Sequence, residues 1–121
     1  MEYREMDLNE YQREAVKTAV FPAEDGIAYC SLKLCGEAGE HAEKVGKLYF
    51  RHDSGELEHM QKDMMDAKVH SIVQELGDVM WYVANLAELY GYTLEEIAQM
   101  NLVKLRDRQE RGVLKGSGDT R

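Results

Sequence analysis

Apolar side chains recur at steps of three and four residues along most of the chain, a pattern typical of helices with one buried face. We predict four helices, over residues 7–20, 27–50, 69–89 and 93–111. The apolar positions expected to face inward are Leu8, Tyr11, Ala15 and Ala19; Leu34, Ala38, Ala42, Val45 and Tyr49; Ile72, Leu76, Val79, Val83 and Leu86; and Ile97, Met100 and Leu105.

Capping residues mark several of these helix ends. Either Asp7 or Asn9 is suited to cap the first helix, because a short polar side chain can accept a hydrogen bond from the first turn. Thr93 and Glu96 have the T-x-x-E spacing of a capping box, and Gly91 is placed to end the helix before it.

Polar or glycine-containing segments separate and follow the helices. Pro22 and Gly26 break the chain after the first helix. Residues 51–68 are polar and weakly periodic, so we expect a loop at 53–55 followed by an exposed, partly helical connection. We therefore expect one domain over residues 1–111 and a flexible, glycine-rich tail over 112–121.

The predicted fold is all-α: a protomer of four to five helices, arranged as an antiparallel bundle and completed by dimerisation, with a dimer of dimers as the larger alternative. Each helix carries one strong apolar stripe, and such a chain buries more apolar surface in a dimer than alone. Gly36, Gly39 and Gly46 interrupt the second helix. Because glycine weakens a helix, we expect a backbone or a ligand to approach closely there.

Composition excludes several classes of protein. The chain has 121 residues, 44% of them hydrophobic, which is enough for one core and too apolar for a disordered chain. Its net charge of −8 argues against general attraction to duplex nucleic acid. No apolar run is long enough to span a bilayer or to form a signal sequence, so we expect a cytoplasmic protein without a membrane partner. Cys30 and Cys35 are expected to be small buried residues.

Two acidic pairs stand beside apolar stripes. Glu37 with Glu40, and Glu75 with Asp78, are each three residues apart, so each pair projects from roughly one side of its helix. If the two helices pack along their stripes, the four carboxylates meet and raise one another's pKa values. A divalent cation removes that conflict, and ligation by oxygen alone suits Mg²⁺ or Mn²⁺. A solvated acidic face is the alternative.

The motifs G-E-A-G-E, E-L-G-D-V-M-W-Y and N-L-V-K-L-R-D-R, in this order, resemble those of the MazG-like nucleoside triphosphate pyrophosphohydrolases. This resemblance implies that Glu37, Glu40, Glu75 and Asp78 are the catalytic, metal-binding carboxylates. It also implies a dimer or tetramer with sites near the subunit interface. Some relatives have a glutamate directly before the first motif glutamate, where this chain has Gly36.

The resemblance further implies that Asn101 and Lys104 on the last helix contact phosphate. Arg108 is a plausible third contact, with Arg106 as its competitor, and positions 101, 104 and 108 share one helix face. The implied reaction is hydrolysis of a nucleoside triphosphate to the monophosphate and pyrophosphate, by attack of water at the α-phosphorus. Common, deoxy and modified nucleotides all fit these phosphate-directed motifs.

Further residues near these motifs have two interpretations each. Lys47 is a phosphate contact or part of a solvated face. Tyr11 and Tyr82 line the nucleotide pocket or pack, whereas Trp81 is expected to pack.

Two rival functions remain open. The first is a non-catalytic helical oligomer that senses nucleotides or binds a partner. The second is di-iron chemistry, indicated by one E-x-x-H match at Glu56 and His59, although such sites need two copies of this motif.

Overall fold

The computed structural model describes residues 3–49, 61–116 and 118, and within these ranges the chain is helical and contains no strand. The prediction of an all-α protomer is therefore confirmed. The elements in chain order are α1 (Leu8–Lys17), a short 3₁₀ turn η1 (Ala23–Asp25), α2 (Gly26–Tyr49), α3 (Lys62–Tyr90) and α4 (Leu94–Glu110).

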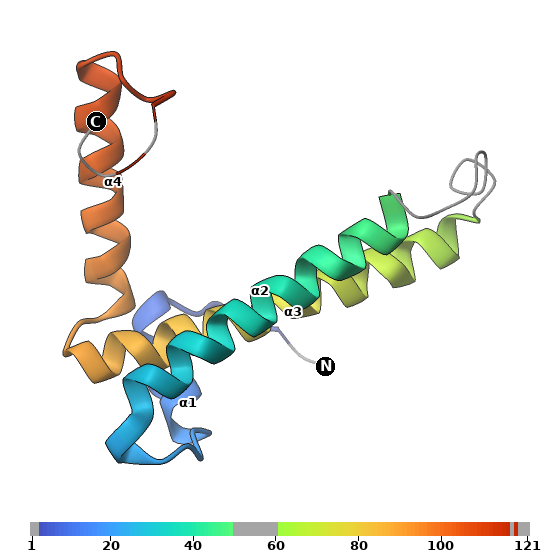
Figure 1. Ribbon diagram of the computed structural model, residues 1–121, viewed down its shortest axis with the longest axis horizontal. Coiled ribbons are helices and arrows are strands. Elements are labelled where there is room, and N and C mark those ends of the chain that lie inside the picture. The colour runs from blue at the N-terminus through green and yellow to red at the C-terminus, as the bar shows by residue number, and fades with distance from the viewer. Residues whose placement is uncertain (1–2, 50–60, 117, 119–121) are drawn as a thin grey trace.

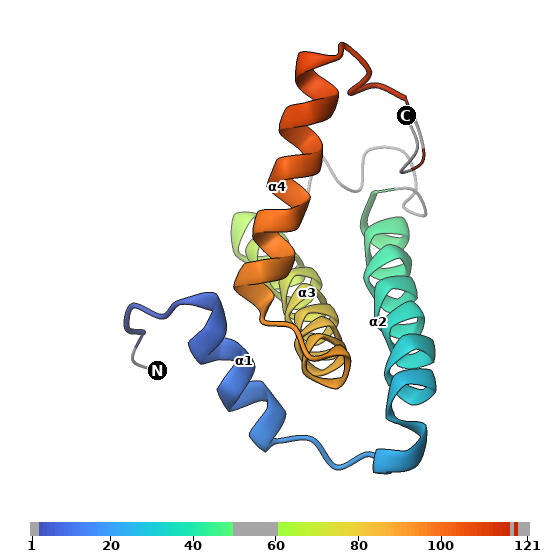
Figure 2. The same ribbon diagram turned by 90° about the vertical axis from the view of Figure 1, so that its left-hand side faces the viewer.

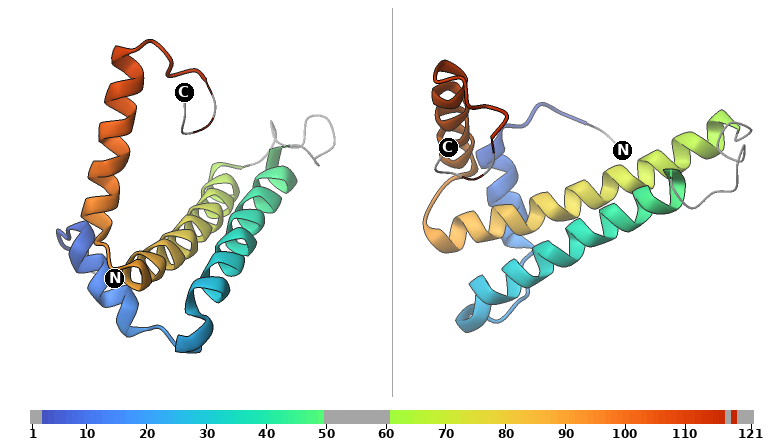
Figure 3. Two further views of the ribbon diagram at one scale, coloured as in Figure 1. Left: turned by 60° about the vertical axis from the view of Figure 1, so that its left-hand side comes forward. Right: turned by 45° about the horizontal axis from the view of Figure 1, so that its top comes forward.

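Helices α2 and α3 form a long antiparallel pair (Figure 1), and this pair is the most extensive contact between elements in the described chain. Helix α1 packs against α3 and against the start of α4. The turn at residues 91–93, called the corner below, joins α3 to α4. Helix α4 leaves the corner at a steep angle to α3, and it diverges from the α2–α3 pair toward its C-terminal end (Figures 2 and 3). No described part of α4 contacts α2.

Side-chain caps fix the starts of α1 and α4. Asp7 Oδ1 accepts a hydrogen bond of 2.7 Å from the backbone N–H of Glu10, so Asp7 rather than Asn9 caps α1. The predicted capping box is confirmed, because the Thr93 hydroxyl accepts from Glu96 N–H and the Glu96 carboxylate accepts from Thr93 N–H, both at 3.0 Å.

The third helix is longer than its periodicity predicted. It begins at Lys62 rather than at residue 69, and it ends as predicted before Gly91, whose φ of 79° is the left-handed conformation that glycine adopts readily. The added turns contain Met, Ala, Lys and Asp, and they carry an ion pair of 3.3 Å between Lys62 and Asp66. Local helix propensity, rather than an apolar face, extends this helix. The predicted loop at 53–55 lies outside the described residues.

A compact core lies where α1, α3 and α4 meet. Its buried members are small, which lets the helix backbones approach closely. They are Ala15, Ala84, Ala87 and Leu94, with Tyr11, Trp81, Val83 and Ile97 packed around them.

The buried side chain of Gln12 ties α1 to the corner between α3 and α4. Its Oε1 accepts from the backbone N–H of Leu94 at 2.7 Å. Its Nε2 donates to the carbonyl of Tyr92 at 3.0 Å and to the carboxylate of Glu88 at 3.1 Å. These bonds satisfy polar groups at the start of α4 and so fix the direction in which α4 leaves the corner.

Several apolar positions expected to face inward are exposed in the protomer. Tyr49, Leu76 and Met100 are 50%, 45% and 55% exposed. The inward expectation is wrong for these three residues, and also for Leu8, Ala38 and Ala42, which are exposed as well. Each of them lies on a side of its helix that the other described elements leave uncovered. None of the described helices has the length and apolar character needed to cross a membrane.

Two smaller expectations concern the glycines and cysteines of α2. At Gly36, Gly39 and Gly46, no atom from another described part of the chain lies within 4 Å of the position a Cβ would take, so no other backbone of this protomer approaches them closely. Close approach of a ligand there stays a prediction. Cys30 is buried as expected, but Cys35 is exposed, because it lies on the open side of α2.

Candidate metal centre

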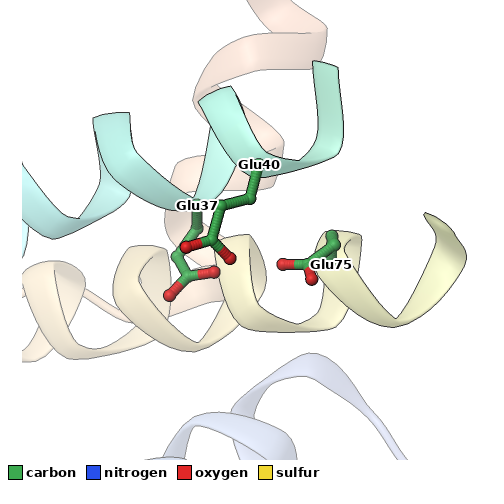
Figure 4. Close-up of side chains that lie close together, drawn as sticks. All are labelled: Glu37, Glu40 and Glu75. Atoms are coloured by element: carbon green, nitrogen blue, oxygen red, sulfur yellow. The ribbon is translucent and has the colours of Figure 1, made fainter. Parts of the chain in front are cut away.

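Three carboxylates converge between α2 and α3. Glu37 and Glu40 extend from α2 toward α3, and Glu75 extends from α3 toward them (Figure 4). One carboxylate oxygen from each residue lies within 4.8 Å of the other two. The three-residue spacing on α2 and the antiparallel packing of the two helices therefore produce a cluster of oxygen ligands from separate segments.

Two oxygens in this cluster are buried without a hydrogen-bond partner among the described residues. They are Oε2 of Glu37 and Oε2 of Glu75, and the Glu75 residue is only 8% exposed. A buried polar atom without a partner is unfavourable and calls for an explanation, such as an ion. Because hard oxygen ligands suit Mg²⁺ and Mn²⁺, the residues present fit the expected cation.

Lys44 is a member of this site that the sequence analysis did not identify. Its Nζ lies 2.8 Å from Glu75 Oε1 and donates to Ser71 Oγ at 2.9 Å. Its position four residues after Glu40 places it on the same side of α2, which is a signal that the sequence contained. Lys47, predicted as a phosphate contact or as part of a solvated face, forms an exposed ion pair with Glu43 at 3.1 Å. Its phosphate-binding role stays a prediction.

The charges around the cluster shift two pKa values in opposite directions. Burial raises the pKa of Glu37 above its ordinary 4.5, and the neighbouring charges of Glu40 and Asp78 raise it further. The hydrogen bond from Lys44 lowers the pKa of Glu75, although burial acts against it. The expectation that the acids all raise one another's pKa is therefore wrong for Glu75.

Asp78 lies one turn along α3 from Glu75 and is exposed. It does not belong to the group of three mutually close oxygens. It is near enough to raise the pKa of Glu37, and it also adds to the rise that burial gives the pKa of Tyr11 on α1. Asp78 and Tyr11 thus flank the cluster on the side where α1 packs on α3.

Aromatic side chains border the same site. Burial raises the pKa of Tyr82, and its neighbours Tyr29 and Glu37 add to this shift, so Tyr82 lies beside the acidic cluster. The indole N–H of Trp81 donates to Thr18 Oγ1 at 2.7 Å, and its ring meets that of Tyr82 edge to face at 4.8 Å between centroids. The expectation that Trp81 packs is confirmed.

Two of the predicted phosphate contacts on α4 are exposed and the third is buried. Asn101 and Lys104 are exposed on α4, which diverges from the α2–α3 pair (Figure 3). Arg108 is only 6% exposed, and its guanidinium donates to the carbonyl of Gly118 at 3.4 Å. Asn101 also borders an apolar groove lined by Leu8, Val79, Met80, Val83, Leu94, Ile97 and Ala98. The phosphate-binding roles remain predictions.

The structure describes the first half of the tail, residues 112–116, and also residue 118. Arg108 connects to Val113 through a backbone hydrogen bond of 2.9 Å, so the start of the tail turns back beside α4. The domain boundary at residue 111 remains a prediction. Glu56 and His59 lie outside the described residues, and nothing follows about the di-iron alternative.

The fold and the site together place the chain among all-helical proteins in which two antiparallel helices bring carboxylates together at their seam. The model of the MazG nucleotide pyrophosphohydrolase domain matches residues 28–113, which include all four predicted metal ligands, and the chain belongs to this family. It is 41% identical over 122 residues to the "Gene 37 protein" of Mycobacterium phage L5, and the match covers 96% of this chain and all of the phage protein. No solved structure matches the chain significantly.

Proposed function

We propose that the protein hydrolyses nucleoside triphosphates to nucleoside monophosphate and pyrophosphate in a reaction that depends on Mg²⁺, with Mn²⁺ as a substitute. The observation that carries this proposal is the pair of buried carboxylate oxygens, on Glu37 and Glu75, that have no partner among the described residues. Membership of the nucleotide pyrophosphohydrolase family supports the reaction class.

The proposed metal ligands are Glu37, Glu40 and Glu75, with Asp78 as the fourth. These carboxylates would hold a divalent cation, which would neutralise phosphate charge and lower the pKa of an attacking water. The oxygen of that water forms a bond to the α-phosphorus, the bond from this phosphorus to the α,β-bridging oxygen breaks, and pyrophosphate leaves. A carboxylate of the cluster accepts the proton of the water.

The proposed phosphate contacts are Lys47 on α2 and Asn101, Lys104 and Arg108 on α4, and we propose that Tyr11 and Tyr82 line the nucleotide pocket. Cations near the β- and γ-phosphates stabilise the charge that develops on the leaving group. Since α4 diverges from α2 and α3 in the protomer, we propose that its polar face acts at the site of a second copy in a homodimer or homotetramer.

An exposed apolar stripe on α3 supports this assembly. Val69, Val73, Leu76 and Met80 follow one another at steps of four, three and four residues, and they are 38–52% exposed. Such spacing is typical of a helix face that packs against another helix. A large exposed apolar surface commonly marks an interface, and a second copy of the chain is the partner that we propose.

Product analysis tests the proposed reaction. The protein is incubated with a panel of common, deoxy and modified triphosphates, with Mg²⁺ or with a chelator, and the products are separated. We expect monophosphate and pyrophosphate from at least one substrate with Mg²⁺, and neither product with the chelator. The turnover rate of Glu40→Gln should be lower by at least about 100-fold, the scale of loss seen when a group that stabilises the transition state is removed. Glu14→Gln, an exposed acid on α1, is the matched control. Absence of turnover across the panel, or release of the diphosphate, contradicts the proposal.

A further inference from the structure

A cavity of about 200 Å³ lies between α2 and α3, next to the acidic cluster. Its lining combines three lysines with a hydroxyl group and two apolar side chains. The residues are Lys44, Lys47, Leu48, Lys68, Ser71 and Ile72. Because Lys44 and Ser71 also form the hydrogen bond beside Glu75, the lysine cavity and the acidic cluster share a wall.

The three lysines converge from both helices, and their present partners are compatible with binding an anion. Lys47 is held by Glu43 only in an exposed pair of 3.1 Å, and such pairs contribute roughly 0–1 kcal/mol. Lys68 is exposed on the first half of α3. Ser71 Oγ accepts from Lys44, so its own hydroxyl hydrogen is a further donor for a ligand.

The size and position of the cavity indicate which anion fits. At about 200 Å³ it is smaller than the roughly 300–1,000 Å³ of pockets that hold a whole drug-sized ligand. It therefore suits a fragment such as one or two phosphate groups. Along the axis of α2, Lys44 and Lys47 lie about 6 and 10 Å beyond Glu40, since a helix rises about 1.5 Å per residue.

The order of groups along the two helices gives the substrate a direction. Tyr29 and Tyr82 lie toward one end of the seam, Glu37 and Glu75 in the middle, and the lysine cavity at the other end. At the tyrosine end one ammonium is present, because Lys33 Nζ lies 5.8 Å from the centroid of the Tyr29 ring. Three lysines line the cavity at the other end, so the larger positive charge favours a triphosphate whose outer phosphates point away from the tyrosines.

We propose that the lysine cavity is the subsite for the two terminal phosphates of the substrate, and thus for the pyrophosphate that leaves. This inference rests on the proposed function and adds a phosphate site within the protomer that does not depend on α4. Lys44, Lys47 and Lys68 neutralise the charge that forms on pyrophosphate when its bond to the α-phosphorus breaks.

Binding of inorganic pyrophosphate tests the subsite directly. Calorimetric titration in a chelating buffer avoids any contribution of a metal ion. We expect the double variant Lys47→Ala/Lys68→Ala to bind pyrophosphate about tenfold or more weakly than the unmodified protein, as expected from loss of charge-assisted contacts. Lys62→Ala is the matched control, because Lys62 lies on α3 outside the cavity and pairs with Asp66. Both substitutions are at exposed positions, and circular dichroism verifies that the variants are helical.

The outcomes separate this inference from the proposed function. Equal pyrophosphate binding by the double variant and the Lys62→Ala control overturns the subsite, as does absence of binding by the unmodified protein, whether or not triphosphates are hydrolysed. Lysine-dependent binding together with no hydrolysis in the product analysis supports an anion site and refutes the reaction. If the unmodified protein shows both lysine-dependent pyrophosphate binding and triphosphate hydrolysis, the double variant should have a higher KM for the hydrolysed triphosphate. Its inhibition by the monophosphate product should be unchanged.

Discussion

Lys44 and Glu75 form an ion pair across the seam between α2 and α3, with Lys44 Nζ 2.8 Å from Glu75 Oε1. The pair joins two sites of opposite charge, because Glu75 belongs to the acidic cluster and Lys44 lines the lysine cavity. One ammonium group thus compensates a buried carboxylate and borders the proposed phosphate subsite.

Replacing Lys44 by Met is expected to destabilise the metal-free protein at neutral pH. The pKa of Glu75 lies below its ordinary 4.5, so its pairing stabilises the fold above that pH, and this contribution is lost as pH falls through the folded-state pKa. The difference in free energy of unfolding between the unmodified protein and Lys44→Met should therefore become smaller as the pH is lowered.

Urea unfolding in a chelating buffer, from about pH 7 down to about pH 3, measures this deficit. Lys17→Met is the control, because Lys17 forms only an exposed pair with Glu14 and its loss should change stability by less than about 1 kcal/mol. A Lys44→Met variant as stable as the unmodified protein at pH 7 would show that the ion pair compensates nothing.

Glu37→Gln is expected to have the opposite effect on the metal-free protein. The pKa of Glu37 is raised, chiefly by burial, so the folded state holds its proton more tightly than the unfolded state. Stability then falls as pH rises from the ordinary value of 4.5 through the raised value. Glutamine removes this loss, and the variant should be more stable than the unmodified protein at pH 7 and similar to it at about pH 4.

Thermal unfolding with and without Mn²⁺ examines this second variant. Without metal, Glu37→Gln should unfold at a higher temperature than the unmodified protein. Saturating Mn²⁺ should raise the unfolding temperature of the unmodified protein more than that of the variant, since ligand binding to the folded state stabilises it. A variant less stable than the unmodified protein at pH 7 in chelator would mean that the Glu37 carboxylate is satisfied without a cation.

Contacts within one helix were predictable from the sequence, whereas contacts between helices were not. The three-residue spacing of Glu37 and Glu40, and the capping box at Thr93, were predictable because each depends on neighbours within one turn. The Lys44–Glu75 pair depends on the register between two helices, which apolar stripes fix only approximately.

The direction of α4 was unpredictable for a similar reason. It depends on the buried bonds that Gln12 makes with the corner around Tyr92 and Leu94, more than 75 positions along the chain. Asn101, Lys104 and Arg108 do share α4 as expected, but the position of that helix relative to the acids follows from this corner rather than from any local pattern.

Gln12→Leu is expected to lower the free energy of unfolding by about 2 kcal/mol, because the Leu94 N–H and the Tyr92 carbonyl lose buried partners. Denaturant unfolding gives this value. Gln99→Leu, on the exposed face of α4, should stay within about 0.5 kcal/mol. Equal effects at the two positions would refute the role of Gln12 in fixing the corner.

Leu76→Lys is expected to weaken the proposed assembly. Leu76 is 45% exposed in the middle of the α3 stripe, and a lysine there places an unpaired charge in an apolar interface. Sedimentation velocity should show a dimer or tetramer for the unmodified protein and a shift toward monomer for the variant. Leu114→Lys alters a leucine of similar exposure, 43%, outside that stripe and serves as control. A monomeric unmodified protein would contradict the proposed assembly.

If carboxylates of α2 and α3 jointly hold a divalent cation, calorimetric titration of the nucleotide-free protein with Mn²⁺ will detect it. We expect saturable binding that weakens by about tenfold or more in both Glu40→Gln and Glu75→Gln, equivalent to about 1.4 kcal/mol per factor of ten, and that is unchanged in Glu14→Gln. Binding that is absent in the unmodified protein, or that is equally strong in all three variants, would contradict the proposed metal site.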